Sequence, residues 1–300
     1  PRPPVFMRPS ARKGSGAFLH PSLNFYNFGR GRIAMGSQSQ RKRAFLTRNP
    51  MCCFCGGQTP AETEDHLPAR ALFLNRRWPE GYVFPACRAC NAGSSDDELV
   101  MAALVRLGVM TDLTAEGEAD LERVLSGLSF RLPQVYQSLR EVSRVETRRF
   151  LRDRGVRGTT LPGIGEVYMV TVPATVIDVT QRYAEKLGKA LHYLHAGKIL
   201  PSTGKVVTRT FTNADLLNSN MPDKFFALLG GVPVLRRDVT LLADQFSYRF
   251  GVVGDGEASG YWIQFRGSMA MLVAVFLDEA EFQRRKAERA ASTQFFTETA

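Results

Sequence analysis

Two Cys-x-x-Cys pairs constrain the fold of this chain more than any other feature. Cys52-x-x-Cys55 and Cys87-x-x-Cys90 hold four of its five cysteines, and Cys53 is the fifth. Four thiolates in two such pairs can close the tetrahedral shell of a structural zinc ion without help from the rest of the chain. The spacing therefore predicts a small metal-bound unit that does not depend on a large core of its own.

Other uses of paired cysteines fit this sequence less well. Thiol–disulfide exchange uses one pair after a βαβ pattern, and no such pattern precedes Cys52. A disulfide framework spreads cysteines through a chain, whereas none of the 210 residues after Cys90 is a cysteine. The 31 residues between Cys55 and Cys87 exceed the usual ribbon gap of about 15 to 20, so this segment must carry structure of its own. Cys53 stays open as an alternative ligand to Cys52.

The positive charge of the chain is concentrated near its N-terminus. The net charge is +10, but residues 1–50 contain ten Arg and Lys and no acidic residue, which leaves 29 basic and 29 acidic residues for 51–300. Bulk charge therefore does not indicate a nucleic-acid-binding surface on the folded part. Residues 1–40 show no periodic apolar face and are predicted to be a disordered basic tail, of which we expect much of 1–34 to be dispensable.

No segment has the features of a membrane anchor or a secretory signal. The longest apolar runs fall well short of the roughly 18 to 20 residues that a membrane helix needs. Because no secretory segment is evident and the zinc site needs reduced thiols, we expect a cytoplasmic protein that does not enter a membrane.

The remainder of the chain is predicted to be α+β. Ser95 and Glu98 form a capping-box pattern that begins a helix, and further helices are predicted over 115–152 with an interruption at Pro133. Runs of adjacent strands then favour a mostly antiparallel sheet. The expected later elements are strands at 166–172, 206–211, 233–242, 246–253 and 261–276 and helices at 173–194 and 278–289.

The patterns together predict four segments. They are a disordered basic tail (1–40), a zinc-bound ββα domain (41–110), a helical connector (111–160) and a C-terminal α+β domain of unknown role (161–300).

An Asp-His pair and an asparagine lie close to the cysteine pairs. Asp65-His66 falls between the pairs, and Asn91 directly follows Cys90. Residues 50–57 fit a hairpin with the first pair at its tip, and a short helix is expected after the second pair. Zinc would then hold the hairpin against the helix, with His66 and Asn91 facing each other. A structural zinc site needs neither residue, although a lone histidine is more often structural and a lone asparagine more often a helix cap.

These residues together resemble the HNH endonuclease (ββα-metal) superfamily in its zinc-stabilised four-cysteine form. The resemblance covers about residues 45 to 100 and is carried by the first cysteine pair, Glu64-Asp-His66, Pro68 and Val-Phe-Pro-Ala-Cys-Arg-Ala-Cys-Asn at 83–91. Residues 66–70 with 95–97, and more faintly 189–193, are similar to a bacterial branch with an uncharacterised C-terminal extension.

The resemblance implies an endonuclease that hydrolyses phosphodiester bonds of nucleic acid, with DNA as the expected substrate. His66 would be the general base that takes a proton from water. Asp65 and Asn91 would hold a catalytic Mg²⁺ or Mn²⁺ ion beside the structural zinc. Arg70 and Arg88 are candidates to hold the substrate phosphate, with ordinary surface arginines as the alternative.

One departure from the superfamily and one rival function remain open. The usual middle asparagine would fall near Tyr82, which cannot supply an amide, and this puts the rate in doubt more than metal binding. The rival is a non-catalytic zinc-ribbon module that binds nucleic acid or a protein partner, although the presence of both Asp65 and His66 favours the enzyme. His192 and His195 are predicted to be structural. The residues of the C-terminal domain leave three roles open for it: choice of the substrate, contact with a partner protein, or formation of a dimer.

Overall fold

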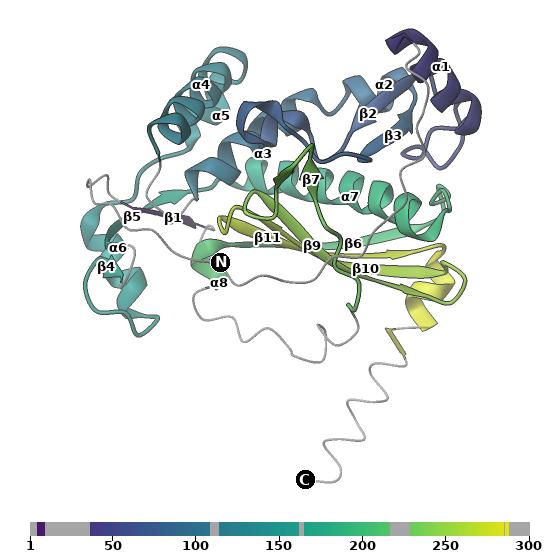
Figure 1. Ribbon diagram of the computed structural model, residues 1–300. Coiled ribbons are helices and arrows are strands. Elements are labelled where there is room, and N and C mark those ends of the chain that lie inside the picture. The colour runs from purple at the N-terminus through teal and green to yellow at the C-terminus, as the bar shows by residue number, and fades with distance from the viewer. Residues whose placement is uncertain are drawn as a thin grey trace.

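A computed structural model describes residues 5–9, 37–108, 114–161, 165–216, 229–284 and 286–287. Within these ranges the protein is a mixture of helices and antiparallel strands (Figure 1). The predicted α+β class with a mostly antiparallel sheet is confirmed. No helix in the described ranges is long and apolar enough to cross a membrane.

The main sheet consists of four antiparallel strands. They are β6 (Lys205–Thr212), β9 (Phe246–Val253), β10 (Ala258–Phe265) and β11 (Met269–Phe276), in the spatial order β6-β11-β10-β9. The single strand predicted at 261–276 is in fact parts of two strands with a turn between them. Arg266 and Gly267 have φ angles of 48° and 64° at that turn, and this reverses the chain so that β10 and β11 pair with each other.

The strand predicted at 233–242 forms a short hairpin instead. It consists of β7 (Arg236–Arg237) and β8 (Thr240–Leu241). Leu235 and Leu242 flank the hairpin and are buried in the core, so both of its ends are fixed while its tip projects. Of the helix predicted at 278–289, residues 279–284 and 286–287 are helical, and 288–289 lie outside the described residues.

One long helix, α7 (Ala174–Ala196), lies across a face of the main sheet (Figure 1). At Gly188 the helix and sheet are so close that a Cβ atom would lie 2.6 Å from Val273 Cγ1, which explains the glycine at this position. The other side of α7 contacts α3 (Ser95–Leu107) and the cysteine region. This central helix therefore connects the sheet with the candidate site.

The cysteine region, residues 37–94, contains two helices and a two-stranded hairpin. These are α1 (Gln38–Arg48), β2 (Thr63–His66), β3 (Val83–Ala86) and α2 (Arg88–Ala92). β2 and β3 pair antiparallel, and α2 begins directly after Cys87. α1 was not predicted and starts inside the segment assigned to the tail, because Ser37 and Gln40 form a capping box there.

The predicted capping box at Ser95 is wrong. Ser94 is the N-cap of α3, and its hydroxyl donates to Glu98 Oε1 at 2.8 Å rather than accepting a helix N–H. Lys186 of α7 donates to the same hydroxyl at 2.5 Å. The Ser94 hydroxyl therefore belongs to a polar cluster between α3 and α7, and it accepts no hydrogen bond from the first turn of α3.

Three helices follow α3 where helices were predicted. They are α4 (Ala115–Arg131), α5 (Pro133–Ser138) and α6 (Arg144–Arg152). Pro133 begins α5, where its missing N–H costs no helical hydrogen bond.

Part of the predicted disordered tail forms a strand, which corrects that prediction. β1 (Val5–Pro9) pairs with β5 (Gly165–Thr171), and β5 also pairs with β4 (Thr160–Leu161). Met7 is buried, and the Asn213 side chain accepts from its N–H at 2.9 Å and donates to its C=O at 2.7 Å. Residues 1–4 and 10–36 of the predicted tail lie outside the described residues.

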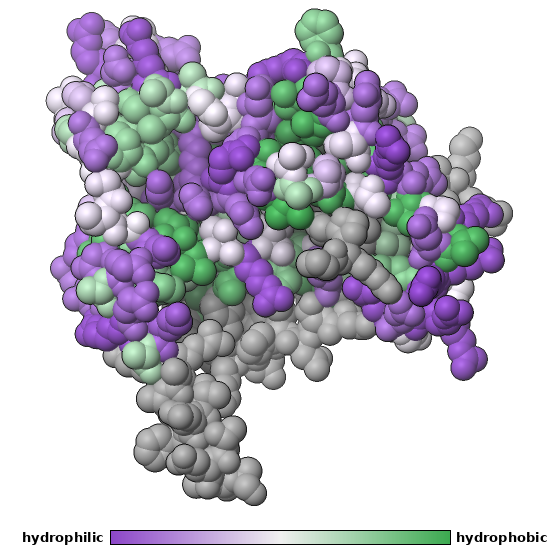
Figure 2. Space-filling view, turned by 180° about the vertical axis from the view of Figure 1, so that it is seen from behind, coloured by the Kyte–Doolittle hydropathy of each residue, from purple (hydrophilic) through white to green (hydrophobic). Residues whose placement is uncertain are grey.

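A continuous hydrophobic core extends from the cysteine region to the main sheet. It includes Phe84 of β3, Leu104 of α3, Leu187 of α7 and Val273 of β11. The predicted boundary between the zinc-bound domain and the C-terminal domain therefore does not separate two cores. The division into domains stays a prediction. Seen from behind, hydrophilic side chains cover most of the described surface and apolar ones appear in separate areas (Figure 2).

Candidate functional site

Four of the five cysteines converge beside the β2–β3 hairpin. The Sγ atoms of Cys52, Cys55, Cys87 and Cys90 all lie within 4.8 Å of one another. A tetrahedral zinc ion with Zn–S bonds of about 2.3 Å places its sulfur ligands about 3.8 Å apart, so this set fits the ion. Cys53 lies outside the group, and burial raises the pKa of its thiol. The structure therefore favours Cys52 over Cys53 as the fourth ligand.

The backbone around the cysteine cluster is arranged to support thiolates. The N–H of Phe54 donates to Cys52 Sγ at 3.4 Å, and the N–H of Cys90 donates to Cys87 Sγ at 3.5 Å. Gly56 turns the chain after the first pair with a φ of 73°, and a Cβ atom there would lie 2.6 Å from a backbone nitrogen of the turn before β6. The first pair is thus packed tightly against the C-terminal part of the chain.

His66 lies at the end of β2 among cations and an aromatic ring. Its Nε2 is 2.5 Å from Arg70 Nη2, and its ring meets the edge of the Trp78 indole with 4.9 Å between centroids. Arginine can only donate, so this nitrogen accepts and the imidazole is neutral. Burial and the charges of Arg70 and Arg237 lower the pKa of His66 to about 4. The imidazole is therefore unprotonated at neutral pH.

Two arginines from distant parts of the chain contact the same indole. Arg70 Cζ lies 3.8 Å from the centroid of the Trp78 ring, and Arg237 Cζ lies 4.3 Å from it. Both distances are within the range of cation–π attraction. Arg237 belongs to β7, so the C-terminal part of the chain reaches the surroundings of His66. We refer to His66, Arg70, Trp78 and Arg237 as the His66 cluster.

Asp65 has different surroundings from His66, because neighbouring residues of a strand point to opposite faces. Asp65 is buried, and its Oδ2 lies 2.6 Å from Lys186 Nζ in an ion pair without hydrogen-bond alignment. Lys186 also lies 3.7 Å from Glu98 Oε1, and burial raises the pKa of Glu98. The Asp65 carboxylate is therefore already paired with a cation.

Asn91 lies in α2 and contacts the first half of β2. Its Nδ2 donates to Thr63 Oγ1 at 2.9 Å and to the Glu64 carbonyl at 3.4 Å. Thr63 and Asp65 share a face of the strand, whereas His66 lies on the other face. The structure thus places Asn91 on the Asp65 side of the hairpin. Among the described contacts, the Asn91 side chain forms no direct hydrogen bond with Asp65 or with His66.

The two predicted phosphate-binding arginines differ in their positions. Arg70 is part of the His66 cluster, whereas the Arg88 side chain is 82% exposed and pairs with Glu62 at 3.4 Å. Tyr82, the position of the superfamily's middle asparagine, is buried and shares a hydrogen bond of 2.7 Å with the Tyr248 hydroxyl. Tyr82 therefore packs the β2–β3 hairpin against the main sheet.

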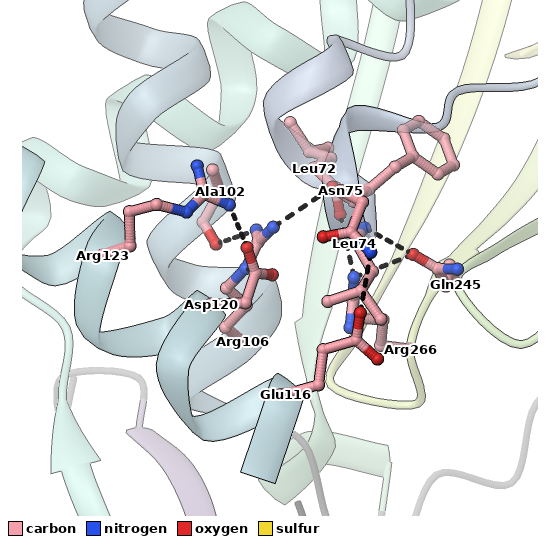
Figure 3. Close-up of polar contacts among 12 residues, drawn as sticks. Leu72, Leu74, Asn75, Ala102, Arg106, Glu116, Asp120, Arg123, Gln245 and Arg266 are labelled. Atoms are coloured by element: carbon pink, nitrogen blue, oxygen red, sulfur yellow. Dashed lines mark hydrogen bonds and ion pairs between the residues drawn. The ribbon is translucent and has the colours of Figure 1, made fainter. Parts of the chain in front are cut away.

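The segment between β2 and β3 carries Arg70 and Trp78. Contacts of Leu72 and Leu74 with the C-terminal part of the chain hold this segment in place (Figure 3). It contains two 3₁₀ turns, η1 (Arg70–Leu72) and η2 (Leu74–Arg76). Gln245 accepts from the Leu74 N–H at 2.7 Å and from Arg266 at 2.9 Å. Arg266 donates in turn to the Leu72 carbonyl at 3.4 Å.

A buried ion pair holds the same segment from the helical side (Figure 3). Arg106 of α3 lies 2.7 Å from Asp120 of α4, and both side chains are at most 5% exposed. Arg106 also donates to the Phe73 carbonyl at 3.5 Å and to the Ala102 carbonyl at 2.8 Å. The position of the His66 cluster thus depends on both α3–α4 and the sheet.

Comparison with known proteins gives no family for this chain: no family model, no curated protein and no solved structure matches it.

The sequence did not indicate three residues that define the two sets of contacts. Trp78, Lys186 and Arg237 come from separate segments, and no short motif links them to the cysteine pairs. Lys186 lies on the face of α7 that also carries Lys189, which donates to the Phe54 carbonyl at 3.3 Å. Two lysines on one side of this amphipathic helix could have been used to predict that α7 contacts polar groups on that side.

His192 and His195 were predicted to be structural, and both are half-buried or buried in contacts of α7 with the sheet. His192 Nδ1 lies 2.8 Å from Ser259 Oγ, and His195 Nε2 lies 2.7 Å from the Tyr248 hydroxyl. Burial lowers the pKa of each to about 4. Within the described residues they belong to no group of potential metal ligands.

Proposed function

We propose that this chain hydrolyses phosphodiester bonds of nucleic acid, with DNA as the substrate, in the manner of HNH endonucleases. The observation that carries the proposal is the His66 cluster at one end of the β2–β3 hairpin, whose other end leads into the four-cysteine centre. A neutral imidazole can act as a general base once Arg70 releases it, and guanidinium groups next to it can bind the phosphate to be attacked.

Arg70 connects substrate binding with the release of the base. In the absence of substrate it donates to His66 Nε2, which occupies the lone pair that a general base needs. A phosphate oxygen is charged and accepts a stronger hydrogen bond from a guanidinium than a neutral imidazole does. When a phosphate draws Arg70 away, His66 becomes free to take a proton from water.

Zinc would be held by Cys52, Cys55, Cys87 and Cys90 and would have a structural role. Four thiolates close its coordination shell, so it offers no open position for water or substrate. Its contribution is to hold the segments that flank β2 and β3.

A catalytic divalent ion on Asp65 and Asn91 fits the observed arrangement less well than zinc fits the four cysteines. The ammonium group of Lys186 already neutralises the Asp65 carboxylate, and the Asn91 amide nitrogen is bonded to β2. Asp65 also points away from His66. The Mg²⁺ or Mn²⁺ of the sequence prediction therefore stays a proposal, and we assign no step of the reaction to it.

We expect His66→Ala to lower the rate of plasmid cleavage by about 10²–10⁴-fold, because the general base is removed. The measurement is nicking or linearisation of supercoiled plasmid in Mg²⁺ or Mn²⁺, with zinc content determined for each protein. Added imidazole should restore part of the activity of His66→Ala, since it can enter the space left by the ring. An inactive wild type, or equal cleavage by both proteins, would remove His66 from this role.

The Asp65–Lys186 pair favours a second candidate function, a zinc module that binds without cutting. In this case Lys186 takes the place that a divalent ion would otherwise occupy, and the contacts of Lys186 with Asp65 and Ser94 are purely structural. Binding of nucleic acid by the wild type without cleavage would support this candidate.

We expect Lys186→Met to lower the melting temperature, because it leaves the buried Asp65 carboxylate without its cation. Millimolar Mn²⁺ should recover part of the loss in the variant and change the wild type little. Differential scanning fluorimetry with and without MnCl₂ measures both effects. If Mn²⁺ instead stabilises the wild type and Asp65→Asn abolishes this, the ion binds beside Lys186 and the catalytic metal of the first candidate is supported.

A further inference from the structure

We propose that the β7–β8 hairpin completes a binding site for the phosphate backbone of nucleic acid, in which Arg70 and Arg237 hold one phosphodiester over Trp78. This inference names the substrate-binding role of the C-terminal region and rests on the proposed function for the reaction that follows. In this proposal the β7–β8 hairpin, which lies outside the cysteine region, contacts the substrate directly.

The two guanidinium groups are brought together from segments that lie far apart in the sequence. Both contact the Trp78 indole, at 3.8 Å for Arg70 and 4.3 Å for Arg237. Trp78 is half-buried and its ring is perpendicular to that of His66, so the indole is a fixed base for both cations. Two positive groups on one ring repel each other, and an anion that bridges them removes this repulsion.

The hairpin is held in this position by contacts that do not use Arg237. The N–H of Glu80 donates to the Arg236 carbonyl at 2.9 Å, and Glu80 Oε1 accepts from the N–H of Asp238 at 2.9 Å. Asp238 also pairs with Arg77 at 3.3 Å. Backbone contacts of Arg236 and Asp238 therefore position Arg237. Its guanidinium group is not needed to hold the hairpin and can bind a ligand.

The protein neutralises the positive charge at this position only in part, through the Glu64 carboxylate near Arg70. Among the described residues no carboxylate forms an ion pair with Arg70 or Arg237. The Arg70 Nε is buried and has no hydrogen-bond partner. Burial and the neighbouring Arg76 and Arg237 lower the pKa of Arg70, and the Glu64 carboxylate offsets this only in part. A phosphate bound by the terminal N–H groups of the two arginines would compensate this charge.

A nucleic-acid backbone suits this site better than a small anion. Arg76 is exposed and its charge acts on Arg70, so positive charge continues beyond a single phosphate. Phosphodiesters accept the paired N–H groups of arginine, and successive phosphates can follow a row of such groups. Because the contacts described are cationic, they predict binding that depends on salt and not on base sequence.

The test compares Arg237→Ala with Arg236→Ala. Both changes remove one arginine from the same two-residue strand, but only Arg237 contacts Trp78. The probe is a fluorescein-labelled DNA of mixed sequence, as single strand and duplex, with binding followed by anisotropy at several salt concentrations. We expect Arg237→Ala to weaken binding about tenfold and to reduce the salt slope by about 1, and Arg236→Ala to weaken it less than about twofold. Arg237→Lys should lie between them, since it keeps the charge but loses the paired N–H groups.

Trp78 provides a second readout that a general loss of charge would not change. The chain has two tryptophans, and Trp262 is buried, so Trp262→Phe leaves Trp78 as the fluorescent reporter. At a DNA concentration near the Kd of Trp262→Phe, DNA should alter the emission of this variant and have a much smaller effect on Trp262→Phe combined with Arg237→Ala. Unchanged zinc content and melting temperature of the Arg237 variants establish that they are folded.

Equal weakening by the two arginine variants, no effect of Arg237→Ala, or no binding of DNA would each overturn the inference. Plasmid cleavage by the same proteins separates it from the proposed function. Arg237-dependent binding without cleavage by the wild type would support the site and reject the nuclease. Cleavage that requires His66 but is unaffected by Arg237→Ala would support the nuclease and reject the site.

Discussion

Cys87→Ser is expected to lose zinc and to unfold cooperatively at a much lower temperature than the wild type. Binding of structural zinc contributes about 10–16 kcal/mol of apparent free energy in small zinc-dependent folds, and this free energy is coupled to folding. Cys87 is one of four converging sulfurs and directly precedes α2. Its loss should therefore release the hairpin and α2 together.

The effect should extend beyond the cysteine region. Phe84 of the hairpin is part of the same hydrophobic core as Leu187 of α7 and Val273 of the main sheet. We therefore expect one lowered transition by circular dichroism rather than an early transition followed by an unchanged one. Cys53→Ser is the matched control, because Cys53 is buried beside the site but lies outside the four-sulfur group. A Cys87→Ser protein that keeps one equivalent of zinc and melts like the wild type would contradict the assignment.

Asp120→Ala is expected to lower the free energy of unfolding by about 3–5 kcal/mol, the usual cost of removing one partner of a buried ion pair. It leaves Arg106 charged at 2% exposure, with only carbonyl oxygens of Ala102 and Phe73 to accept from it. Equilibrium urea denaturation measures the loss. The same change should weaken DNA binding indirectly, because Arg106 holds the segment that carries Arg70 and Trp78.

Two variants separate the buried charge from the loss of packing. Arg106→Met combined with Asp120→Leu removes both charges and should recover much of the stability, as replacement of buried ion pairs by apolar residues often does. Arg123→Ala removes the second, half-exposed partner of Asp120 and should cost less than about 1 kcal/mol. A loss below about 1 kcal/mol for Asp120→Ala would show that water or another group compensates Arg106.

The sequence predicted the features that depend on short-range spacing. The two cysteine pairs converge as expected, and β9 has the bounds that apolar composition and flanking turns indicated. The helices over 115–152 were predicted from the periodicity of their apolar residues. Pro133 was expected to interrupt them, because proline is tolerated in the first turn of a helix and disrupts its interior. These properties are local, so a single chain segment contains the information.

Features that depend on long-range contacts were missed or predicted wrongly. β1 is too short to show alternation and is a strand only because β5 and Asn213 satisfy its backbone. Ser95 had the capping pattern, but Lys186 of a distant helix recruits Ser94 and Glu98 instead. Arg237 reaches Trp78 through a hairpin whose sequence contains no motif.

The position of α7 has a consequence for how this protein can be divided or recombined. Tyr183, Lys186, Lys189 and Tyr193 of this helix bond to the cysteine region, while Leu187 belongs to the core that continues into the sheet. A fragment that ends near residue 110 would leave a buried carboxylate, several backbone groups and the inner face of α3 without partners. The cysteine unit is therefore not a portable module, and any chimaera that transplants it must also carry α7.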